Sequence, residues 1–385
     1  MTKKIIRYGM VGGSLNAFIG GVHRQAISYE PMANLVAGCF TRNEELNQDT
    51  GEVYNLDKER VYKNYIEMAE KESAREDKID FVVICAPNYV HYEIAKEFLL
   101  KGINVVCEKP LCFEIAQGEE LKKIAEEKDL LFAVTYSYSG YPMVKFAKQL
   151  IKDGLIGEII NINAEYPQEW LIDEIGEDND NTTIKLSGWR TDPKIAGISN
   201  CVGDIGTHIE NTITYVTGLK VKKVAAKIDR FGHQLDLNAN MLIEYDNGSS
   251  GNYWCSQISV GNMNGLTFRI YGTKGAIEWD QEHPEYLKVT EKGKAPQIMA
   301  RGNAYIYGNA ETLNRLPGGH PEGYYEALAN LYKIIIGAVA KKKYSEELTE
   351  ADYDYPTIDD GIDGVKFIHA VIESGNNNSK WVTIL

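Results

Sequence analysis

The sequence of 385 residues lacks long apolar runs, an excess of positive charge and any metal-binding pattern among its cysteines. No stretch approaches the roughly 20 apolar residues that a membrane-spanning helix needs, and no signal-peptide-like apolar segment follows the N-terminus. The formal net charge of −14 argues against nonspecific binding to nucleic acid or anionic membranes, because both attract basic surfaces. The sequence therefore predicts no nucleic-acid or membrane partner, and its charge does not identify a substrate.

The cysteines are few and dispersed. They are Cys39, Cys85, Cys107, Cys112, Cys201 and Cys255. None forms a Cys-x-x-Cys pair, and no group of cysteines and histidines has zinc-site spacing, so we expect no metal. The first three lie in or beside apolar runs, where a free cysteine behaves as a small hydrophobic residue. We therefore expect reduced thiols and a cytoplasmic protein, because disulfides are rare in that compartment.

The first third of the chain alternates strand-like and helix-like segments. Short apolar runs, which suit strands buried on both faces, lie at 5–11, 35–40, 80–86, 104–107 and 130–135. Between two of them, residues 92–100 repeat apolar side chains three and four positions apart, as an amphipathic helix does. Repeated strand–helix–strand units predict an α/β Rossmann domain with a doubly wound parallel sheet over residues 1–138.

The pattern changes after about residue 140. Strand-like segments at 238–245 and 251–256 are joined by Asp246-Asn247-Gly248, a strong hairpin signal, and Gly272-Thr273-Lys274-Gly275 indicates a second hairpin. Helices are expected near residues 204–217, 324–339 and 361–374. Residues 139–385 are therefore predicted to form an α+β domain with a large, mostly antiparallel open sheet, which binds substrate and supports oligomerisation.

A glycine turn follows the first predicted strand. Gly12-Gly13-Ser14 ends the strand, and the helix expected next begins near Phe18 and Ile19. Such a turn can bring backbone N–H groups and a helix N-terminus to a pyrophosphate. Ser14 stands where the G-x-G-x-x-G pattern has its second glycine, and the motif alone is equally typical of an ordinary tight strand–helix turn.

The second predicted strand ends without an acidic residue. Cys39-Phe40-Thr41-Arg42 stands where an Asp or Glu would bind the ribose 2′-hydroxyl of NAD. An arginine can instead accept the 2′-phosphate of NADP, so Thr41 and Arg42 are compatible with either cofactor. Alternatively, Arg42 is a solvated surface charge with no cofactor role.

The fourth predicted strand ends in Glu108-Lys109-Pro110. The carboxyl ends of parallel strands line the crevice where ligands bind in open α/β sheets. Pro110 restricts Lys109 to an extended conformation, and a lysine whose pKa is lowered can act as a general acid or base. The alternative is a surface Glu–Lys pair at a strand end.

A second candidate pair lies in Gly203-Asp204-Ile205-Gly206-Thr207-His208. On a helix, Asp204 and His208 would lie four residues apart on one face. An acid and an imidazole so placed can bind a sugar hydroxyl and remove its proton. The alternative makes Asp204 a helix cap and His208 a hydrogen-bonded core histidine.

Together these motifs resemble the Gfo/Idh/MocA oxidoreductases over essentially the whole chain. Glu108-Lys109-Pro110 is similar to the family's Glu-Lys-Pro motif, and Asp204 and His208 are similar to its Asp-x-x-x-His pair. The resemblance implies that Lys109 is a catalytic acid or base and cofactor contact. It also implies that His208 takes the substrate's hydroxyl proton while Asp204 orients the substrate.

Several stretches resemble the branch of the family that includes levoglucosan dehydrogenase. They lie at 9–13, 17–24, 86–88, 140–143, 165–170, 189–193 and 319–324. The branch resemblance implies NAD-linked oxidation of a pyranose ring hydroxyl, at C3. Because this branch commonly lacks the acid after the second strand, Thr41 and Arg42 do not exclude NAD.

Further site residues follow from position. Pro87, Asn88 and His91 follow the third predicted strand and are expected on the nicotinamide side, although His91 is equally suited to cap a helix. Tyr138, Gln168, Trp170 and Arg190 offer hydrogen bonds and a stacking face for a sugar, and each has an alternative role in the core or at the rim. The expected cofactor contacts are Gly12, Gly13, Ser14, Phe18, Ile19, Thr41, Arg42, Pro87, Asn88, His91, Glu108, Lys109 and Arg190. The expected substrate contacts are Lys109, Tyr138, Gln168, Trp170, Arg190, Asp204 and His208.

The sequence thus predicts an NAD(P)-dependent dehydrogenase that oxidises a sugar, anhydrosugar or glycoside. One alternative is an internal NAD redox cycle that supports glycoside elimination or epimerisation. Another is a non-enzymatic dinucleotide-sensing regulator. A broad open sheet also suggests a homodimer or homotetramer.

Overall fold

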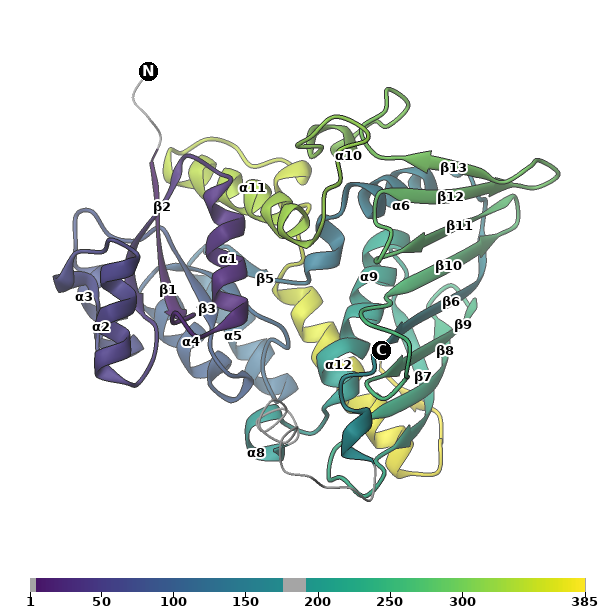
Figure 1. Cartoon of the computed structure of the whole chain (residues 1–385), viewed down its shortest axis with the longest axis horizontal. Coiled ribbons are helices and arrows are strands. Elements are labelled where there is room, and N and C mark those ends of the chain that lie inside the picture. Colours follow the sequence, from purple (N-terminus) through teal and green to yellow (C-terminus); the bar gives the residue numbers. More distant parts are fainter. Residues whose placement is uncertain (1–4, 176–191, 385) are drawn as a thin grey trace. The chain divides into compact units, whose positions relative to one another are not determined.

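The computed structural model describes residues 5–175 and 192–384, which fold into two compact units (Figure 1). The first unit comprises Met1–Gly140 and Tyr324–Ile362, and the second comprises Tyr141–Gly323 and Asp363–Leu385. This division differs from the predicted one at residues 138 and 139, because a late segment returns to the first unit. Among the described residues, no helix is long and apolar enough to cross a membrane.

The first unit contains a parallel five-stranded sheet in the order β2-β1-β3-β4-β5, which confirms the predicted doubly wound fold. Its strands are β1 (Ile6–Gly12), β2 (Ala33–Cys39), β3 (Phe81–Cys85), β4 (Asn104–Cys107) and β5 (Phe132–Val134). The helices between these strands are α1 (Phe18–Ser28), α2 (Glu44–Val53), α3 (Tyr65–Ser73), α4 (His91–Leu100) and α5 (Ile115–Glu127).

Local side chains set where two of these helices begin. The Asn43 side chain accepts a hydrogen bond from the Leu46 amide at the start of α2, and Asn64 accepts one from Glu67 at the start of α3, both at 2.9 Å. Asparagine is a favoured N-cap because its side-chain oxygen satisfies an amide that has no partner within the helix. The helices therefore start where the sequence provides a cap.

The strand order defines where a ligand binds in this unit. Strand β2 pairs with one edge of β1, and the next strand, β3, pairs with the opposite edge of β1. Ligands of open α/β sheets bind at the carboxyl ends of the strands, at such a reversal. Gly12 at the end of β1 pairs with Cys85 at the end of β3, so these two strand ends flank the reversal.

Helix α11 (Tyr324–Lys343) explains why the late segment belongs to the first unit. Its buried residues Leu331, Tyr332 and Ile336 share one apolar cluster with Tyr8 and Phe81 of the sheet. Burial of such side chains is the main favourable contribution to folding. The apolar core of the first unit is therefore complete only after the chain has returned.

The second unit contains a nine-stranded sheet in the order β13-β12-β11-β10-β6-β9-β8-β7-β14. Within this sheet, β6 and β9 are the only described strands that pair in parallel, which confirms a large, mostly antiparallel sheet. The strands are β6 (Ile159–Pro167), β7 (Val221–Asp229), β8 (Asn238–Tyr245), β9 (Ser250–Ser256), β10 (Thr267–Gly272), β11 (Gly275–Asp280), β12 (Tyr286–Glu291), β13 (Gln297–Ala300) and β14 (Val382–Thr383). Both predicted hairpins, β8–β9 and β10–β11, are present.

Helices cover one face of this sheet, as Figure 1 shows for α6, α9 and α12. The helices with residues in this unit are α6 (Pro142–Lys152), α8 (Pro193–Ala196), α9 (Thr207–Thr217), α10 (Asn309–Thr312) and α12 (Ile358–Asn376). Phe367 of α12 packs against Tyr253 of β9, with ring centroids 6.1 Å apart. On the other face, Leu242 is more than half exposed, so the sheet buries one side and leaves the other open.

Adjacent leucines in α4 test the assignment of the core. Leu99 is fully buried, whereas Leu100 is 46% exposed. We expect Leu99→Ala to lower the free energy of unfolding by about 2 to 5 kcal/mol, since it leaves a cavity. Leu100→Ala should change it by only about 0.5 kcal/mol. Urea denaturation followed by circular dichroism measures both, and equal effects would contradict the assigned packing.

Candidate active site

The turn after β1 is shaped for close approach of a ligand's phosphates. Gly12 and Gly13 have φ angles of 84° and 77°, which L side chains rarely adopt. A Cβ at Gly20 would lie 2.1 Å from the Gly13 Cα, so only glycine lets α1 pack against this turn. The N-cap residue of α1, Ala17, makes no side-chain hydrogen bond to the first turn of the helix. This turn and helix N-terminus therefore fit a dinucleotide pyrophosphate.

The other predicted residues of this turn differ in exposure. The Phe18 side chain at the start of α1 is 80% exposed, whereas Ser14 is buried. At the end of β2, the buried Asn47 side chain accepts hydrogen bonds from the amides of Phe40 and Thr41. Arg42 follows on the exposed surface. The structure therefore fixes the backbone at Thr41 and leaves the Arg42 side chain in solvent.

A buried network surrounds the Glu108 carboxylate directly after β4. Its Oε1 lies 2.9 Å from Nε2 of His23 on α1 and also accepts a hydrogen bond from the Thr135 hydroxyl. The other ring nitrogen of His23, Nδ1, lies 2.6 Å from the Tyr332 hydroxyl on α11. His23 and Tyr332 are fully buried. One carboxylate thus ties together β4, the segment after β5, α1 and α11.

The opposite charges of Glu108 and His23 determine which of the two groups carries a proton. Burial would raise the pKa of Glu108, but the His23 hydrogen bond and the positive charges of His23 and Lys109 lower it to about 2. Burial would lower the pKa of His23, but Cys85 and Glu108 together raise it to about 10. At neutral pH, His23 is therefore a cation that donates from both ring nitrogens, and Glu108 is its anion. Lys109, partly exposed, follows directly in the chain.

The predicted residues after β3 have separate roles. His91 is fully buried, and its Nδ1 and Nε2 each lie 2.8 Å from a backbone carbonyl, those of Pro110 and Ala86. Burial lowers its pKa. His91 therefore links the segment after β3 to the Glu-Lys-Pro segment, an arrangement that favours a structural role. Pro87 is exposed and Asn88 half-buried beside this link.

Asp204 and His208 lie on two consecutive helical elements of the second unit. Asp204 occupies a π-helical turn, Val202–Gly206, and His208 lies in the first turn of α9. The helix expected from residue 204 therefore begins with a π turn, a feature frequent at functional sites. Oδ2 of Asp204 accepts a hydrogen bond from Gln257 Nε2 at 2.9 Å. Asp204 is partly exposed, and His208 is 6% exposed.

A polar and aromatic wall adjoins His208. The Tyr166 ring lies 6.2 Å from the His208 ring, and its hydroxyl donates to Asn264 Oδ1 at 2.5 Å. The same oxygen accepts from Gln168 Nε2 at 2.8 Å, and Gln168 Oε1 accepts from Trp170 Nε1 at 2.9 Å. The structure therefore brings Gln168 and Trp170 together on the side of Tyr166, and their contact with substrate stays a prediction. Arg190 lies outside the described residues.

The predicted site residues thus form two groups. The first unit contains the glycine turn, Glu108, Lys109 and Tyr138, whose buried ring lies 6.4 Å from that of Tyr324. The second unit contains Asp204, His208, Gln168 and Trp170. Within the described ranges, no three His, Cys, Asp or Glu side chains are grouped to bind a metal.

Comparison with known proteins identifies the family. Residues 6–136 match the model of an oxidoreductase family with an NAD-binding Rossmann fold, and residues 144–278 match the GFO/IDH/MocA C-terminal domain. The uncharacterized oxidoreductase YfiI of Bacillus subtilis is 37% identical over 98% of this chain and 97% of its own length. The chain belongs to the GFO/IDH/MocA oxidoreductase family.

Two other family members show what related proteins bind. An inositol dehydrogenase homolog from Azotobacter vinelandii, complexed with NAD+, has a TM-score of 0.91 at 32% identity, over 98% of this chain and 97% of its own. Levoglucosan dehydrogenase of Pseudarthrobacter phenanthrenivorans is 26% identical over 80% of each chain. Both the predicted family and the relation to levoglucosan dehydrogenase are confirmed.

Several residues of this GFO/IDH/MocA site were not singled out from the sequence. His23 and Tyr166 lie within the stretches at 17–24 and 165–170 that carry the family resemblance, so a signal for them existed. Gln257 and Asn264 follow β9 in a segment without any motif. Their roles depend on hydrogen bonds across the sheet, which a single sequence does not reveal.

The buried pair predicts a specific pH dependence of stability. The pKa of His23 is raised above its ordinary value of 6.5, so its contribution is complete below about pH 6.5 and is lost toward pH 10. The pKa of Glu108 is lowered from 4.5, so its contribution is lost only as the pH falls toward 2. We expect Glu108→Gln to reduce the free energy of unfolding near pH 7 by about 3 to 5 kcal/mol.

This deficit should shrink as the pH rises toward 10, because the native pair is then lost as well. Urea denaturation between pH 6 and 10 measures it. His283→Gln is the control, because His283 forms an exposed pair with Asp280 at 2.6 Å and should contribute little. A deficit for Glu108→Gln that stays constant over this range would contradict the charged state of the pair.

Proposed function

We propose that this protein is an NAD-dependent dehydrogenase that oxidises a ring hydroxyl, at C3, of a sugar, anhydrosugar or glycoside to a ketone. The observation that supports this most is the juxtaposition of Asp204 and His208 with a wall of Tyr166, Gln168 and Trp170. Amide groups and an indole suit the hydroxyls and the apolar face of a pyranose. The named activities of the inositol and levoglucosan dehydrogenase relatives agree with this substrate class.

Each side chain has a defined role in this proposal. Asp204 accepts a hydrogen bond from a substrate hydroxyl, and His208 removes the proton of the hydroxyl to be oxidised. Lys109 polarises that oxygen during the oxidation or protonates it in the reverse reduction, and Glu108 contributes to cofactor binding. NAD, when bound, supplies the two-electron oxidant. The turn at Gly12 and Gly13 and the N-terminus of α1 would hold its pyrophosphate.

The cofactor preference and location complete the proposal. The segment after β2 has no acid at Thr41 or Arg42 to repel a 2′-phosphate, so NADP is a second cofactor to compare with NAD. All six cysteines are free thiols and buried, in agreement with a reducing, cytoplasmic location.

A substrate panel tests the reaction. Purified protein is incubated with NAD or NADP and with glucose, levoglucosan, inositols or aryl O- and C-glycosides. Reduced-nicotinamide absorbance and mass spectrometry of the sugar are recorded. We expect reduction with a keto-sugar product, and Lys109→Ala and His208→Asn should each lower kcat by about 10²- to 10⁴-fold. Lys128→Ala, at an exposed lysine, is the control.

The other outcomes identify the alternatives. Substrate consumption without net cofactor reduction would replace the proposal with an internal redox cycle. Cofactor binding without turnover of any sugar would favour a sensing role. Wild-type turnover in either site variant would remove that residue from the mechanism.

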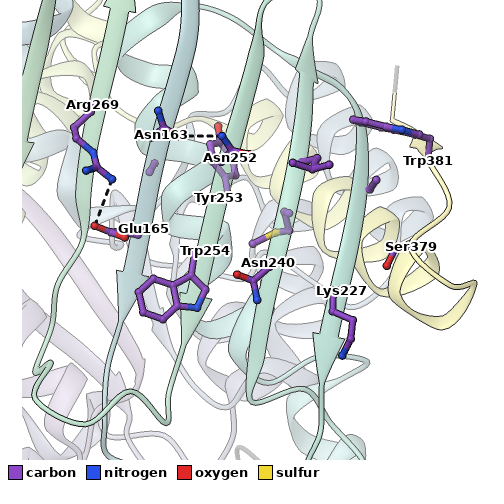
Figure 2. Close-up of a pocket in the computed structure, with 14 residues that line it drawn as sticks. Asn163, Glu165, Lys227, Asn240, Asn252, Tyr253, Trp254, Arg269, Ser379 and Trp381 are labelled. Atoms are coloured by element: carbon purple, nitrogen blue, oxygen red, sulfur yellow. Dashed lines mark hydrogen bonds and ion pairs between the residues drawn. The ribbon is translucent and has the colours of Figure 1, made fainter.

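We further propose that the open face of the nine-stranded sheet packs against a second copy of the chain. A hollow of about 460 Å³ lies on this face, and the residues that line it include Leu242, Trp254 and Trp381. Figure 2 shows Trp254 and Trp381 among the side chains on these strands. Glu165 and Arg269, on neighbouring strands, form an ion pair at 3.7 Å beside it. Exposed apolar and aromatic side chains among charges are typical of protein interfaces.

Measured mass in solution tests this interface. We expect a homodimer or homotetramer by sedimentation velocity, and a smaller assembly for Leu242→Asp, because a charge would be buried at the contact. Val53→Asp places the same charge on another exposed apolar residue, at the end of α2, and should leave the mass unchanged. A monomeric wild-type protein, or an unchanged mass for Leu242→Asp, would refute this interface.

A further inference from the structure

Asp236 anchors the π-helical turn that carries Asp204. It lies just before β8 and is fully buried. Its Oδ2 accepts a hydrogen bond from the Val202 amide at 2.7 Å, and its Oδ1 accepts one from the Asn200 amide at 3.0 Å. A carboxylate from a distant segment therefore caps the start of this turn, where backbone amides have no partner within the helix.

A chain of hydrogen bonds leads from Asp236 to Asp204, and only one assignment of donors and acceptors fits it. A backbone carbonyl can only accept, so the group 3.3 Å from the Asp236 carbonyl oxygen must be the Asn200 Nδ2 donor. The same Nδ2 lies 2.7 Å from Gln257, which must therefore present its Oε1 there. The Nε2 of Gln257 is then the group that lies 2.9 Å from Asp204 Oδ2.

Gln257 has little freedom to reverse this direction. Its side chain is fully buried, and its backbone is fixed on both sides: the backbone N–H donates to the Leu237 carbonyl at 3.0 Å, and the backbone carbonyl accepts from the Leu171 amide at 2.9 Å. A reversed amide would point its oxygen at the Asp204 carboxylate and its NH₂ group at the NH₂ group of Asn200. Both contacts would pair like with like in a buried setting, where unsatisfied polar groups are costly.

We propose that Gln257 is a positioning residue. By donating a hydrogen bond to Asp204, it keeps Asp204 as an ionised carboxylate that accepts hydrogen bonds from substrate hydroxyls. This rests on the role proposed above for Asp204. A substrate hydroxyl at Asp204 is then met by an acceptor and must donate its own proton to it. Asp204 therefore favours substrates with a hydroxyl that can donate a hydrogen bond to it, and His208 is the residue that removes the proton.

Several ionisable groups lie on the described elements around Asp204. His208 follows on α9, Asp236 lies behind Asn200, and the thiols of Cys201 and Cys255 are buried beside the π turn. Burial and the neighbouring Cys255 raise the pKa of Cys201 well above its usual range. The thiol of Cys201 thus stays neutral at neutral pH, and the donor at Asp204 Oδ2 is the uncharged Gln257 amide.

Gln257→Glu tests the direction of the chain with the smallest possible change. The new carboxyl still accepts from Asn200, but it places an oxygen instead of a donor against Asp204 Oδ2. Two carboxyl groups at this distance must share a proton, which raises the apparent pKa of the pair. Because the folded-state pKa is raised, stability is lost as the pH rises above the unfolded value.

Two measurements follow. The melting temperature of Gln257→Glu, relative to that of the wild type, should fall progressively between about pH 5 and about pH 8. For a substrate that the wild type turns over, the acid limb of the kcat/KM profile should move up by about one pH unit or more. Burial alone also raises the pKa of the new carboxyl, so the melting comparison is repeated in an Asp204→Asn background, where the pH-dependent fall should be smaller. A merely structural role for Gln257 would give the same fall in both backgrounds and leave the acid limb of the kcat/KM profile in place.

Gln149→Glu is a matched control. On the exposed side of α6, Gln149 Nε2 donates to Asp153 Oδ1, also at 2.9 Å, so the same chemical change is made beside another aspartate. Water screens that pair, and both the pH dependence of melting and the kcat/KM profile should match the wild type.

The outcomes separate this inference from the proposed function. A pH-dependent melting difference together with a displaced acid limb supports it. A Gln257→Glu variant whose melting follows the wild-type pH dependence would overturn it, as would an unmoved acid limb. If the wild type turns over no sugar, the proposed function fails, and the melting comparison with and without Asp204→Asn still decides whether Gln257 holds Asp204 as an acceptor.

Discussion

A carboxylate buried at the end of a parallel strand stays ionised only if a cation lies beside it, and the first unit is built around one such pair. Glu108 and His23 meet at 2.9 Å, and the Tyr332 hydroxyl completes the histidine's hydrogen bonds. Loss of either charge would leave the other buried and unpaired, which costs far more than the pair itself contributes. The need to pair these two charges therefore constrains three segments: α1, the segment after β4, and α11. Lys109, next in the chain, is presented by this framework.

In the second unit, the buried Asp236 carboxylate is held by uncharged groups among the described residues. Backbone amides and the Asn200 and Gln257 side chains connect it to Asp204, which is partly exposed, while Asn200 Oδ1 is left without a hydrogen-bond partner within the described ranges. Each unit thus presents a candidate catalytic side chain, Lys109 or Asp204, beside a buried hydrogen-bond network. Groups held in this way need little reorganisation when charge develops during a reaction.

The sequence was sufficient for the parts of the structure governed by local patterns. Apolar runs and turn residues predicted the parallel sheet, the open antiparallel sheet and both hairpins, because these depend on neighbours along the chain. The sequence did not indicate that α11 joins the first unit, because no local signal shows that this helix completes its apolar core. At the site, Gln168 and Trp170 were predicted, while Gln257 was not. Its importance depends on partners at Asn200 and Asp204, more than fifty residues away.

The return of α11 also bears on how the chain acquires its structure during synthesis. The ribosome releases the five strands of the parallel sheet early, but Leu331, Tyr332 and Ile336 emerge only after the whole segment Tyr141–Gly323. Until then, Tyr8 and Phe81 lack part of their apolar cover, and His23 lacks the hydroxyl of Tyr332. N-terminal domains commonly fold first as the chain emerges. Here the first unit stays incomplete during synthesis until Tyr141–Gly323 has emerged and α11 can pack against the parallel sheet.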